Sequence, residues 1–164
     1  MNSSNKKKIC FITGSRAEYG LIEKIIKLFS RNKSFKTYLL VTGSHLNNKF
    51  GNTIKYIAKK NIIIKKIKLN LNLDSKESIY GNQLKLSQGI YKFYKSTKPD
   101  CFVVLGDRFE IFSLCSFIQF LNIPIVHIHG GEKTTGSIDD QLRHCITKMS
   151  HIHFVANKEF QSRL

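Results

Sequence analysis

The chain has 164 residues, of which 41% are apolar, so it is long enough for a folded core and is not an intrinsically disordered protein. Its 27 Lys and Arg against 11 Asp and Glu give a net charge of +16, which suits nucleic acid, an anionic membrane or a phosphate-bearing substrate. The lysines are scattered, with one dense cluster at Lys6–Lys8 and no basic stripe interleaved with aromatic residues. We therefore expect neither nucleic acid nor a membrane as a partner.

The cellular compartment is indicated by the four cysteines, which stand apart without a CxxC pair or a histidine at metal-ligand spacing. Isolated cysteines indicate a reducing compartment and not a disulfide framework. No signal peptide opens the sequence, and the most apolar stretch, 111–128, is interrupted by polar residues and Pro124. That stretch predicts a buried helix and strand instead of a membrane span. We expect a cytoplasmic protein without a metal.

Short apolar runs alternate with helical patterns along the chain. The predicted elements are strand 9–12, a helix with the apolar stripe Leu21, Ile22, Ile25, Ile26, Leu28 and Phe29, strand 38–41, a looser segment 50–57, strand 61–69, helix 77–96, strand 101–105, helix 111–121, strand 124–128, helix 139–149 and strand 152–155. Outward lysines indicate that strand 61–69 is at the edge of its sheet.

This alternation predicts an α/β fold with a doubly wound, Rossmann-like parallel sheet. Ligands of such sheets bind beyond the carboxyl ends of the strands, so we expect function in loops 14–20, 43–48, 106–108 and 129–140. The sequence stops soon after the last predicted strand, without a Gly or Pro stop signal. We therefore expect residues 1–164 to form one Rossmann-like domain, the N-terminal half of a truncated two-domain protein.

The first strand-to-helix turn runs from Gly14 to Gly20 and matches neither GxGxxG nor the P-loop, so a dinucleotide cofactor is not supported. The turn does place Arg16 at a helix N-terminus, where a guanidinium and backbone N–H groups suit a phosphate. The alternative is a tight turn in which Arg16 pairs with Glu18 or Glu23.

Gly106-Asp107-Arg108 directly follows a buried strand, so its acid and its base point into the crevice beyond the sheet. The alternative is structural: Asp107 caps the next helix, with Glu110 three residues later completing a capping box.

Titratable groups gather at the loop that runs from His127 through His129 and Glu132 to Asp139 and Asp140. The period of a strand places His127 and His129 on one face. A zinc site is the rival interpretation, although HxHxxE is not a known structural spacing with a fourth ligand in place. Either aspartate also suits a helix N-cap. Carboxylates that converge from neighbouring strand ends suit general acid–base catalysis, because close like charges spread their pKa values apart.

In their order and spacing these motifs resemble the hydrolysing UDP-N-acetylglucosamine 2-epimerases, which feed sialic acid and related nonulosonate synthesis. The motifs are Gly14–Tyr19, Gly43–Leu46, Phe50–Thr53, Gly106–Glu110, His127–Glu132, and Ile138–Asp140 with Arg143-His144. The resemblance covers nearly the whole chain. It implies a GT-B-like fold of two Rossmann-like domains with the active site between them, no cofactor, a UDP-sugar substrate and a homo-oligomer at full length.

The resemblance further implies loss of the C2 proton and expulsion of UDP from C1, giving 2-acetamidoglucal, to which water adds to release N-acetylmannosamine. Asp107 and Asp139 match carboxylates of acid–base catalysis. Some members carry a catalytic Glu where this chain has His129, so either His129 or the nearby Glu132 takes that role. The substrate-binding candidates are Arg16 and Arg108, which match residues facing the UDP, His45 on the sugar side, and Tyr19 and Arg143.

Two alternatives stay open, a variant substrate and a non-catalytic module, and the sequence argues against a third. A close variant of the family acts on UDP-2,4-diacetamido-2,4,6-trideoxy-glucose in the legionaminic acid pathway, and the sequence does not separate the two substrates. Non-hydrolysing epimerases share the fold, but Gly106-Asp107-Arg108 together with Ile138-Asp139-Asp140 argues against them. From a different class, the chain is a non-catalytic nucleotide-sugar-binding module. Residues 1–164 alone are expected to be inactive, because half of the diphosphate site is absent.

Overall fold

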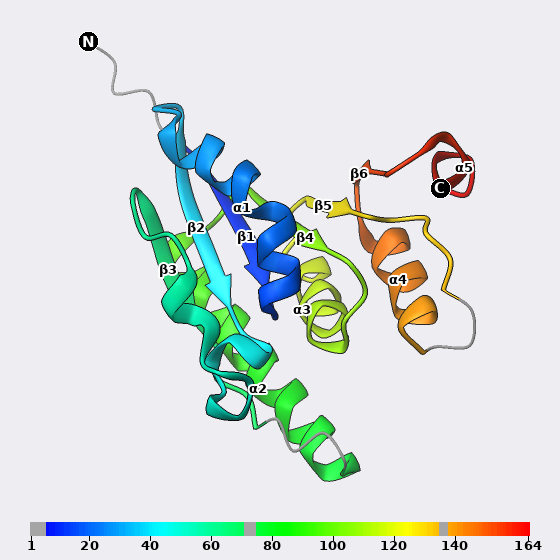
Figure 1. Ribbon diagram of the computed structural model, residues 1–164, viewed down its shortest axis with the longest axis horizontal. Helices are drawn as coiled ribbons and strands as arrows, with labels where there is room; N and C mark the ends of the chain where they lie inside the picture. The colour runs from blue at the N-terminus through cyan, green and yellow to red at the C-terminus, as the bar shows by residue number, and fades with distance from the viewer. Residues whose placement is uncertain (1–5, 71–74, 135–137) are drawn as a thin grey trace.

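The computed structural model describes residues 6–70, 75–134 and 138–164, and in these ranges it contains a six-stranded parallel sheet with the order β3-β2-β1-β4-β5-β6 (Figure 1). The strands are β1 Lys7–Thr13, β2 Phe35–Val41, β3 Ile62–Lys66, β4 Cys101–Leu105, β5 Ile125–Ile128 and β6 Ile152–Phe154. The helices are α1 Arg16–Arg31, α2 Lys76–Thr97, α3 Phe109–Gln119, α4 Ile138–Met149 and α5 Lys158–Gln161, with 3₁₀ turns η1 Gly43–Leu46, η2 Asn48–Phe50 and η3 Thr53–Tyr56. The predicted doubly wound sheet is confirmed. Residues 1–5, at the N-terminus where no signal peptide is predicted, and residues 135–137 of the predicted 129–140 loop lie outside the described ranges.

The inner strands are apolar along most of their length because both of their faces are covered. In β4 the residues from Phe102 to Leu105 are all buried, and β1 is buried from Cys10 to Thr13. The edge position predicted for the third strand is confirmed, and its last residues, Lys65 and Lys66, are exposed. Lysines on an edge strand oppose pairing with another chain.

The helices divide between the two faces of the sheet. One apolar cluster joins β1 and β4 to α2, α3 and α4, and a second joins the opposite face to α1. This division follows from right-handed crossovers: the chain moves from β1 toward β3 in one direction and from β4 toward β6 in the other, so the connecting helices lie on opposite faces.

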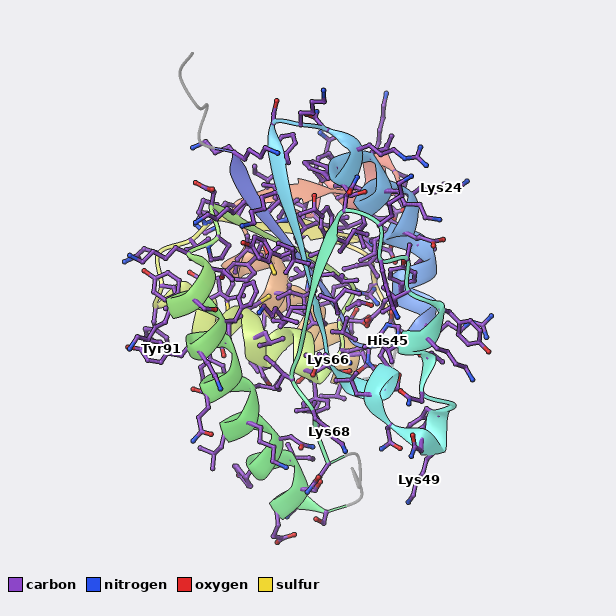
Figure 2. All side chains as sticks on the ribbon, turned by 90° about the vertical axis from the view of Figure 1, so that its left-hand side faces the viewer. Lys24, His45, Lys49, Lys66, Lys68 and Tyr91 are labelled. Atoms are coloured by element: carbon purple, nitrogen blue, oxygen red, sulfur yellow. The ribbon has the colours of Figure 1, made fainter. Side chains whose placement is uncertain are left out.

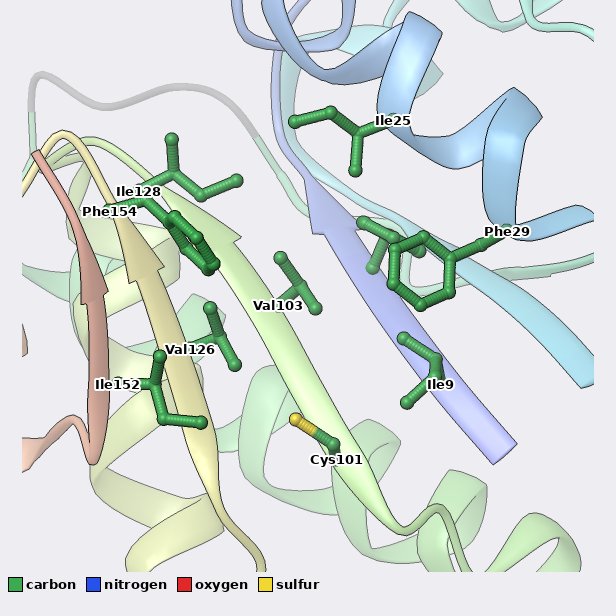
Figure 3. A pocket seen from close by; sticks show the side chains of 10 residues that line it. Ile9, Ile25, Phe29, Cys101, Val103, Val126, Ile128, Ile152 and Phe154 are labelled. Atoms are coloured by element: carbon green, nitrogen blue, oxygen red, sulfur yellow. The ribbon is translucent and has the colours of Figure 1, made fainter. Parts of the chain in front are cut away.

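A consequence of this winding is an open apolar surface beside α1. On the face opposite α3 and α4, strands β4 to β6 border a cavity of about 420 Å³ (Figure 3). Its lining includes Val103 and Val126, which are buried, and Ile152 and Phe154, which are 50% and 61% exposed. The crossovers between β4 and β6 lie on the other face, so they leave this surface uncovered.

The apolar stripe predicted for the first helix is wider than the buried face of α1. Ile22 and Ile26 are buried, whereas Leu21 and Leu28 are 61% and 67% exposed. Positions 21 and 28 are two turns apart and therefore lie together, at the margin of the apolar arc and away from the sheet.

The lysines that dominate the charge are spread over the surface. Figure 2 shows Lys24 and Lys49 projecting from α1 and η2; both are exposed, as is Lys66 of β3. None of the helices in the described ranges is long and apolar enough to cross a membrane. The spread fits lysines that are solvated singly, and the expectation that no nucleic acid binds stays a prediction.

The packing of the core predicts that substitutions of two leucines of α2 differ in their effect on the free energy of unfolding. Leu86 is fully buried, whereas Leu84, two residues earlier, is 66% exposed. Leu86→Ala is expected to lower the free energy of unfolding by about 2–5 kcal/mol, because it removes buried methyl groups and leaves a cavity. Leu84→Ala, the matched control, is expected to change it by less than about 0.5 kcal/mol. Urea denaturation of both variants measures the difference, and equal effects would contradict this packing.

Candidate active site

The carboxyl ends of β1, β2, β4 and β5 lie next to one another, and hydrogen bonds join the loops that leave them. The backbone N–H of His45 donates to the carbonyl oxygen of Gly14 (3.3 Å), which links the loops after β2 and β1. The backbone N–H of Gly106 donates to the carbonyl oxygen of Ile128 (3.2 Å), which links the ends of β4 and β5. The polar residues predicted at four separate strand ends therefore belong to one edge of the sheet.

The turn after β1 is held by Glu18 and not by Arg16. Ser15 caps α1, and its hydroxyl accepts the backbone N–H of Glu18 at 3.3 Å. One oxygen of the Glu18 carboxylate in turn accepts the backbone N–H groups of Gly14 (2.7 Å) and Ser15 (3.1 Å). Arg16 is exposed, and its guanidinium lies 5.1 Å from the ring centre of Tyr56. The alternative in which Arg16 pairs with Glu18 or Glu23 is therefore wrong.

Tyr19 and His45 lie beneath the loops of this edge. The hydroxyl of Tyr19 accepts the backbone N–H of Ala58 at 3.0 Å, and only 5% of the residue is exposed. His45 is 1% exposed, with Nδ1 2.8 Å from the Thr53 hydroxyl and Nε2 3.1 Å from the Thr13 hydroxyl. Burial lowers the pKa of His45 to about 4, so its ring is neutral at pH 7. Substrate contact by either side chain stays a prediction.

Asp107 pairs with an arginine from a distant helix. One oxygen of its carboxylate accepts a hydrogen bond from Nη2 of Arg143, which is 8% exposed in α4. Helix α3 begins at Phe109 with Arg108 at its N-cap, and no side chain makes the capping bond. The interpretation of Asp107 as a helix cap is therefore wrong. The aspartate is held by an ion pair across 36 residues of sequence.

The ion pair extends into the loop after β5. Nη1 of Arg143 lies 3.9 Å from one oxygen of Glu132, and the other oxygen of Glu132 lies 2.5 Å from Nδ1 of His129. Asp107, Arg143, Glu132 and His129 thus form one continuous polar chain that joins the ends of β4 and β5 to α4. The side chains of His129 and Glu132 are 36% and 26% exposed, so this end of the chain reaches solvent.

The prediction that His127 and His129 share one face of the fifth strand is wrong. His127 is fully buried; its Nε2 donates to the carbonyl oxygen of Gly106 (2.8 Å), and its Nδ1 lies 3.3 Å from the Thr147 hydroxyl. Burial lowers the pKa of His127 to about 4. Strand β5 ends at Ile128, and His129 has φ of 64°, which takes it out of the alternation.

The two aspartates of α4 have different surroundings. The helix begins at Ile138, so both lie in its first turn and neither is its N-cap. Asp140 accepts the backbone N–H of Thr134 (2.7 Å), and this hydrogen bond is the main cause that lowers the pKa of its carboxyl. Asp139 is exposed and, with Arg108, lines a cavity of about 430 Å³ between α2, α3 and α4.

Two buried carboxyl groups beside Arg108 were not among the predicted site residues. Glu110 is fully buried, and its Oε1 accepts Nε of Arg108 at 2.7 Å. Oε1 of Glu18 lies 3.7 Å from the same nitrogen. Burial is the main cause that raises the pKa of Glu18 to about 7, and the nearby charge of Glu110 acts in the same direction. The sequence suggests Glu18 only as a partner of Arg16 and Glu110 only as part of a capping box, and no local signal indicates that the two are buried together.

The zinc alternative is not supported by these contacts. Both ring nitrogens of His127 have hydrogen-bond partners, which removes one of the two histidines that such a site would use. Within residues 6–70, 75–134 and 138–164, no three His, Cys, Asp or Glu side chains are grouped so that they could hold a metal ion. The expectation of a metal-free site stays a prediction.

A doubly wound sheet with acids and arginines gathered beyond its carboxyl edge defines a protein of the ligand-binding α/β class. A sequence model described as UDP-N-acetylglucosamine 2-epimerase matches residues 27–164. The chain therefore belongs to the UDP-N-acetylglucosamine 2-epimerase family.

Three curated relatives show the range of named activities. The chain is 40% identical over 159 residues to polysialic acid biosynthesis protein P7 of Escherichia coli, covering 96% of this chain and 41% of the relative. It is 39% identical over 160 residues to the hydrolysing GDP/UDP-N,N'-diacetylbacillosamine 2-epimerase of Campylobacter jejuni (98% and 42% covered). It is 30% identical over 159 residues to the UDP-N-acetylglucosamine 2-epimerase of Neisseria meningitidis (96% and 41% covered). The chain thus spans about 41% of the length of these relatives.

Solved structures agree on the fold. The crystal structure of the Neisseria meningitidis UDP-GlcNAc 2-epimerase bound to UDP-GlcNAc matches with a TM-score of 0.79 at 17% identity, over 95% of this chain and 42% of that one. MurG of Acinetobacter baumannii matches with a TM-score of 0.64 at 12% identity, over 93% of this chain and 42% of that one. At these identities the likeness establishes the GT-B-like N-terminal fold.

Burial of His127 predicts a pH dependence of stability. Its pKa of about 4 in the folded chain lies below the ordinary value near 6.5, so between these pH values the unfolded chain binds a proton that the folded chain does not. The contribution is fully present above about pH 6.5, and stability is lost as the pH falls toward 4, by up to about 1.4 kcal/mol per pH unit.

His127→Gln is expected to flatten the fall of the free energy of unfolding between pH 7 and pH 4, measured by urea denaturation across that range. His144→Gln is the control, because that ring is exposed on α4. Curves for His127→Gln and the wild type that run parallel would contradict the burial of a neutral His127.

Proposed function

We propose that the chain is the N-terminal Rossmann-like domain of a two-domain hydrolysing UDP-sugar 2-epimerase, with a substrate cleft formed by both domains. The proposed reaction converts UDP-N-acetylglucosamine and water to N-acetylmannosamine and UDP through 2-acetamidoglucal. The observation that carries the proposal is the polar chain Asp107–Arg143–Glu132–His129 at the carboxyl edge of a family member's sheet. Residues 1–164 alone are expected to lack turnover, and the full-length protein is expected to be a homo-oligomer.

In the proposed reaction, cationic groups that stabilise the leaving diphosphate are required before a base removes the C2 proton. The C2 proton of the sugar is not acidic, so cleavage of the C1–O bond runs ahead of proton removal and negative charge builds on the departing diphosphate. Arg16, the first residue of α1, and Arg108, the N-cap residue of α3, are proposed to meet that charge. Guanidinium groups suit this task because they bind phosphate oxygens in a fixed fork and stay charged.

Asp107 is proposed to transfer a proton directly to or from the sugar. Arg143 bonds one of its carboxylate oxygens, which fixes the orientation of the group and leaves the second oxygen to meet substrate. Its carboxylate is partly exposed at the tip of β4, as a general acid or base requires. Asp139 is the second proposed acid–base residue. It lines the cavity of about 430 Å³ that Arg108 also lines.

We assign the remaining proton transfer to His129, with Glu132 as the carboxylate that orients it. The bond from Nδ1 of His129 to Glu132 fixes the ring and leaves Nε2 to exchange a proton. The arrangement of a carboxylate behind an imidazole is the one by which other hydrolytic enzymes hold a histidine in a reactive tautomer. This assignment chooses between the two residues that the sequence left as alternatives.

A second substrate is favoured by the relatives. The hydrolysing diacetylbacillosamine 2-epimerases of Campylobacter jejuni and Legionella pneumophila are 39% and 36% identical to the chain, compared with 30% for the Neisseria meningitidis UDP-N-acetylglucosamine enzyme. The alternative substrate is therefore UDP-2,4-diacetamido-2,4,6-trideoxy-glucose.

The proposal is tested by incubating the full-length reading frame with each UDP-sugar in deuterated water, followed by NMR. Hydrolysis with epimerisation is expected to release free UDP and a manno-configured sugar that carries deuterium at C2. Release of an intact UDP-sugar would indicate a non-hydrolysing enzyme. Absence of turnover on both substrates, with UDP still bound, would favour a binding module.

Asp107→Asn in the full-length enzyme is expected to lower turnover by about 100-fold or more, the usual loss when a general acid or base is removed. Asp100→Asn is the matched control, because Asp100 precedes the opposite end of β4, where it accepts the backbone N–H of Lys8. Initial rates of UDP release measure both variants. A rate for Asp107→Asn close to that of Asp100→Asn would remove Asp107 from the chemistry.

A further inference from the structure

We propose that Glu110 is the positioning residue of the site: its buried carboxylate holds the guanidinium of Arg108 at the sheet edge, beneath the loops of Gly14 and Gly43. The inference rests on the proposed function only in that Arg108 is taken to meet the diphosphate of the substrate. The contact of Glu110 with Arg108 and the crowding at the two glycines are properties of the structure.

The contact between Glu110 and Arg108 is close and shielded from water. Glu110 is fully buried in the first turn of α3, whereas the side chain of Arg108 is 37% exposed. The bond of 2.7 Å is made by Nε, the inner nitrogen of the guanidinium. A guanidinium held at its inner nitrogen has a fixed plane, and its outer nitrogens are the ones that can fork onto the oxygens of an anion.

Two loops from other strands close over the same carboxylate. A Cβ atom added to Gly14 would lie 2.5 Å from Oε1 of Glu110, and one added to Gly43 would lie 2.6 Å from the same atom. Gly43 also has φ of 58°, so its backbone alone favours glycine. Gly14 is outside the left-handed region, so at that position the space taken by Glu110 is what excludes a side chain. The ends of β1, β2 and β4 thus meet at one carboxylate oxygen.

The charges around Arg108 explain why Glu110 is the residue that holds it. An ionised carboxylate without water needs a cation, and Arg108 is the cation in contact with it. Glu18, from α1, approaches the same Nε at 3.7 Å, and Asp139, from α4, also acts on Arg108 electrostatically. Glu110 is the nearer of the two glutamates to Nε of Arg108, at 2.7 Å against 3.7 Å for Glu18, and it accepts the hydrogen bond from that nitrogen. Because Arg108 is already ordered, binding of the diphosphate does not have to immobilise its side chain.

A double-mutant cycle on the full-length protein tests the positioning role, with the dissociation constant for UDP as the readout. Glu110→Gln keeps the shape of the side chain but removes its charge, and it is expected to weaken UDP binding about tenfold, the scale of a charged hydrogen bond. In an Arg108→Ala background the same substitution is expected to change UDP binding less than about twofold, because Glu110 acts through Arg108. An equal loss in both backgrounds would show a general structural role and overturn the proposal.

Gly14 supplies an independent variant at the same carboxylate. Gly14→Ala is expected to weaken UDP binding as much as Glu110→Gln, because the added methyl group displaces Oε1 of Glu110. Gly81→Ala is the control, since a Cβ there meets nothing within 4 Å and lies inside α2. Wild-type affinity in Gly14→Ala would contradict the crowding on which the inference depends.

The contact itself is measured without substrate by NMR of the Arg108 Nε–H group, identified by its loss in Arg108→Lys. Hydrogen exchange of this proton is expected to be slowed in the wild type and at least about tenfold faster in Glu110→Ala, because its shielded acceptor is removed. Unchanged exchange overturns the inference. Slow exchange in a wild-type protein that binds no UDP would instead leave the contact intact and contradict the proposed function.

Discussion

The right-handed crossover of parallel strands is the constraint on which the rest of the structure depends. It requires each strand to begin again at the same end of the sheet, so the loops after β1, β2, β4 and β5 meet at one edge. The same constraint sends α3 and α4 to one face and leaves the other face of β4 to β6 open as an apolar cavity. The polar edge and the open apolar surface are thus two results of one handedness.

Lysines and arginines occupy different parts of this protein. Lysines supply most of the net charge of +16 and are spread over the surface, where an ammonium is well hydrated. At the carboxyl edge of the sheet lie Arg16, Arg108 and Arg143, together with more than half of the chain's 11 acids, namely Glu18, Asp107, Glu110, Glu132, Asp139 and Asp140. The edge is therefore a local network of paired charges inside a basic protein, which suits a reaction that needs both a carboxylate for a proton and cations for a leaving diphosphate.

Buried neutral groups support that network from below. His127 and His45 each link elements through both ring nitrogens, and each is held neutral by burial. They bind loops to the sheet without adding charge beneath the arginines, where further positive charge would weaken the pairing of Arg108 and Arg143 with their carboxylates. The residues proposed to act on the substrate are therefore carried by loops that these hydrogen bonds join to the sheet, which suits a site that stabilises developing charge.

The sequence by itself determined the order of elements, the edge strand and the loops that carry the polar residues, because apolar periodicity and strand-end motifs are local signals. Only the tertiary structure decided which charges pair. Asp107 meets Arg143 from 36 positions away instead of capping α3, Arg16 lies against Tyr56, and His129 leaves the strand period through a left-handed residue. Burial of Glu18 and Glu110 beside Arg108 was equally out of reach of the sequence. A buried charge takes its partner from whichever element packs beside it, and that element is set by the winding of the sheet and not by distance along the chain.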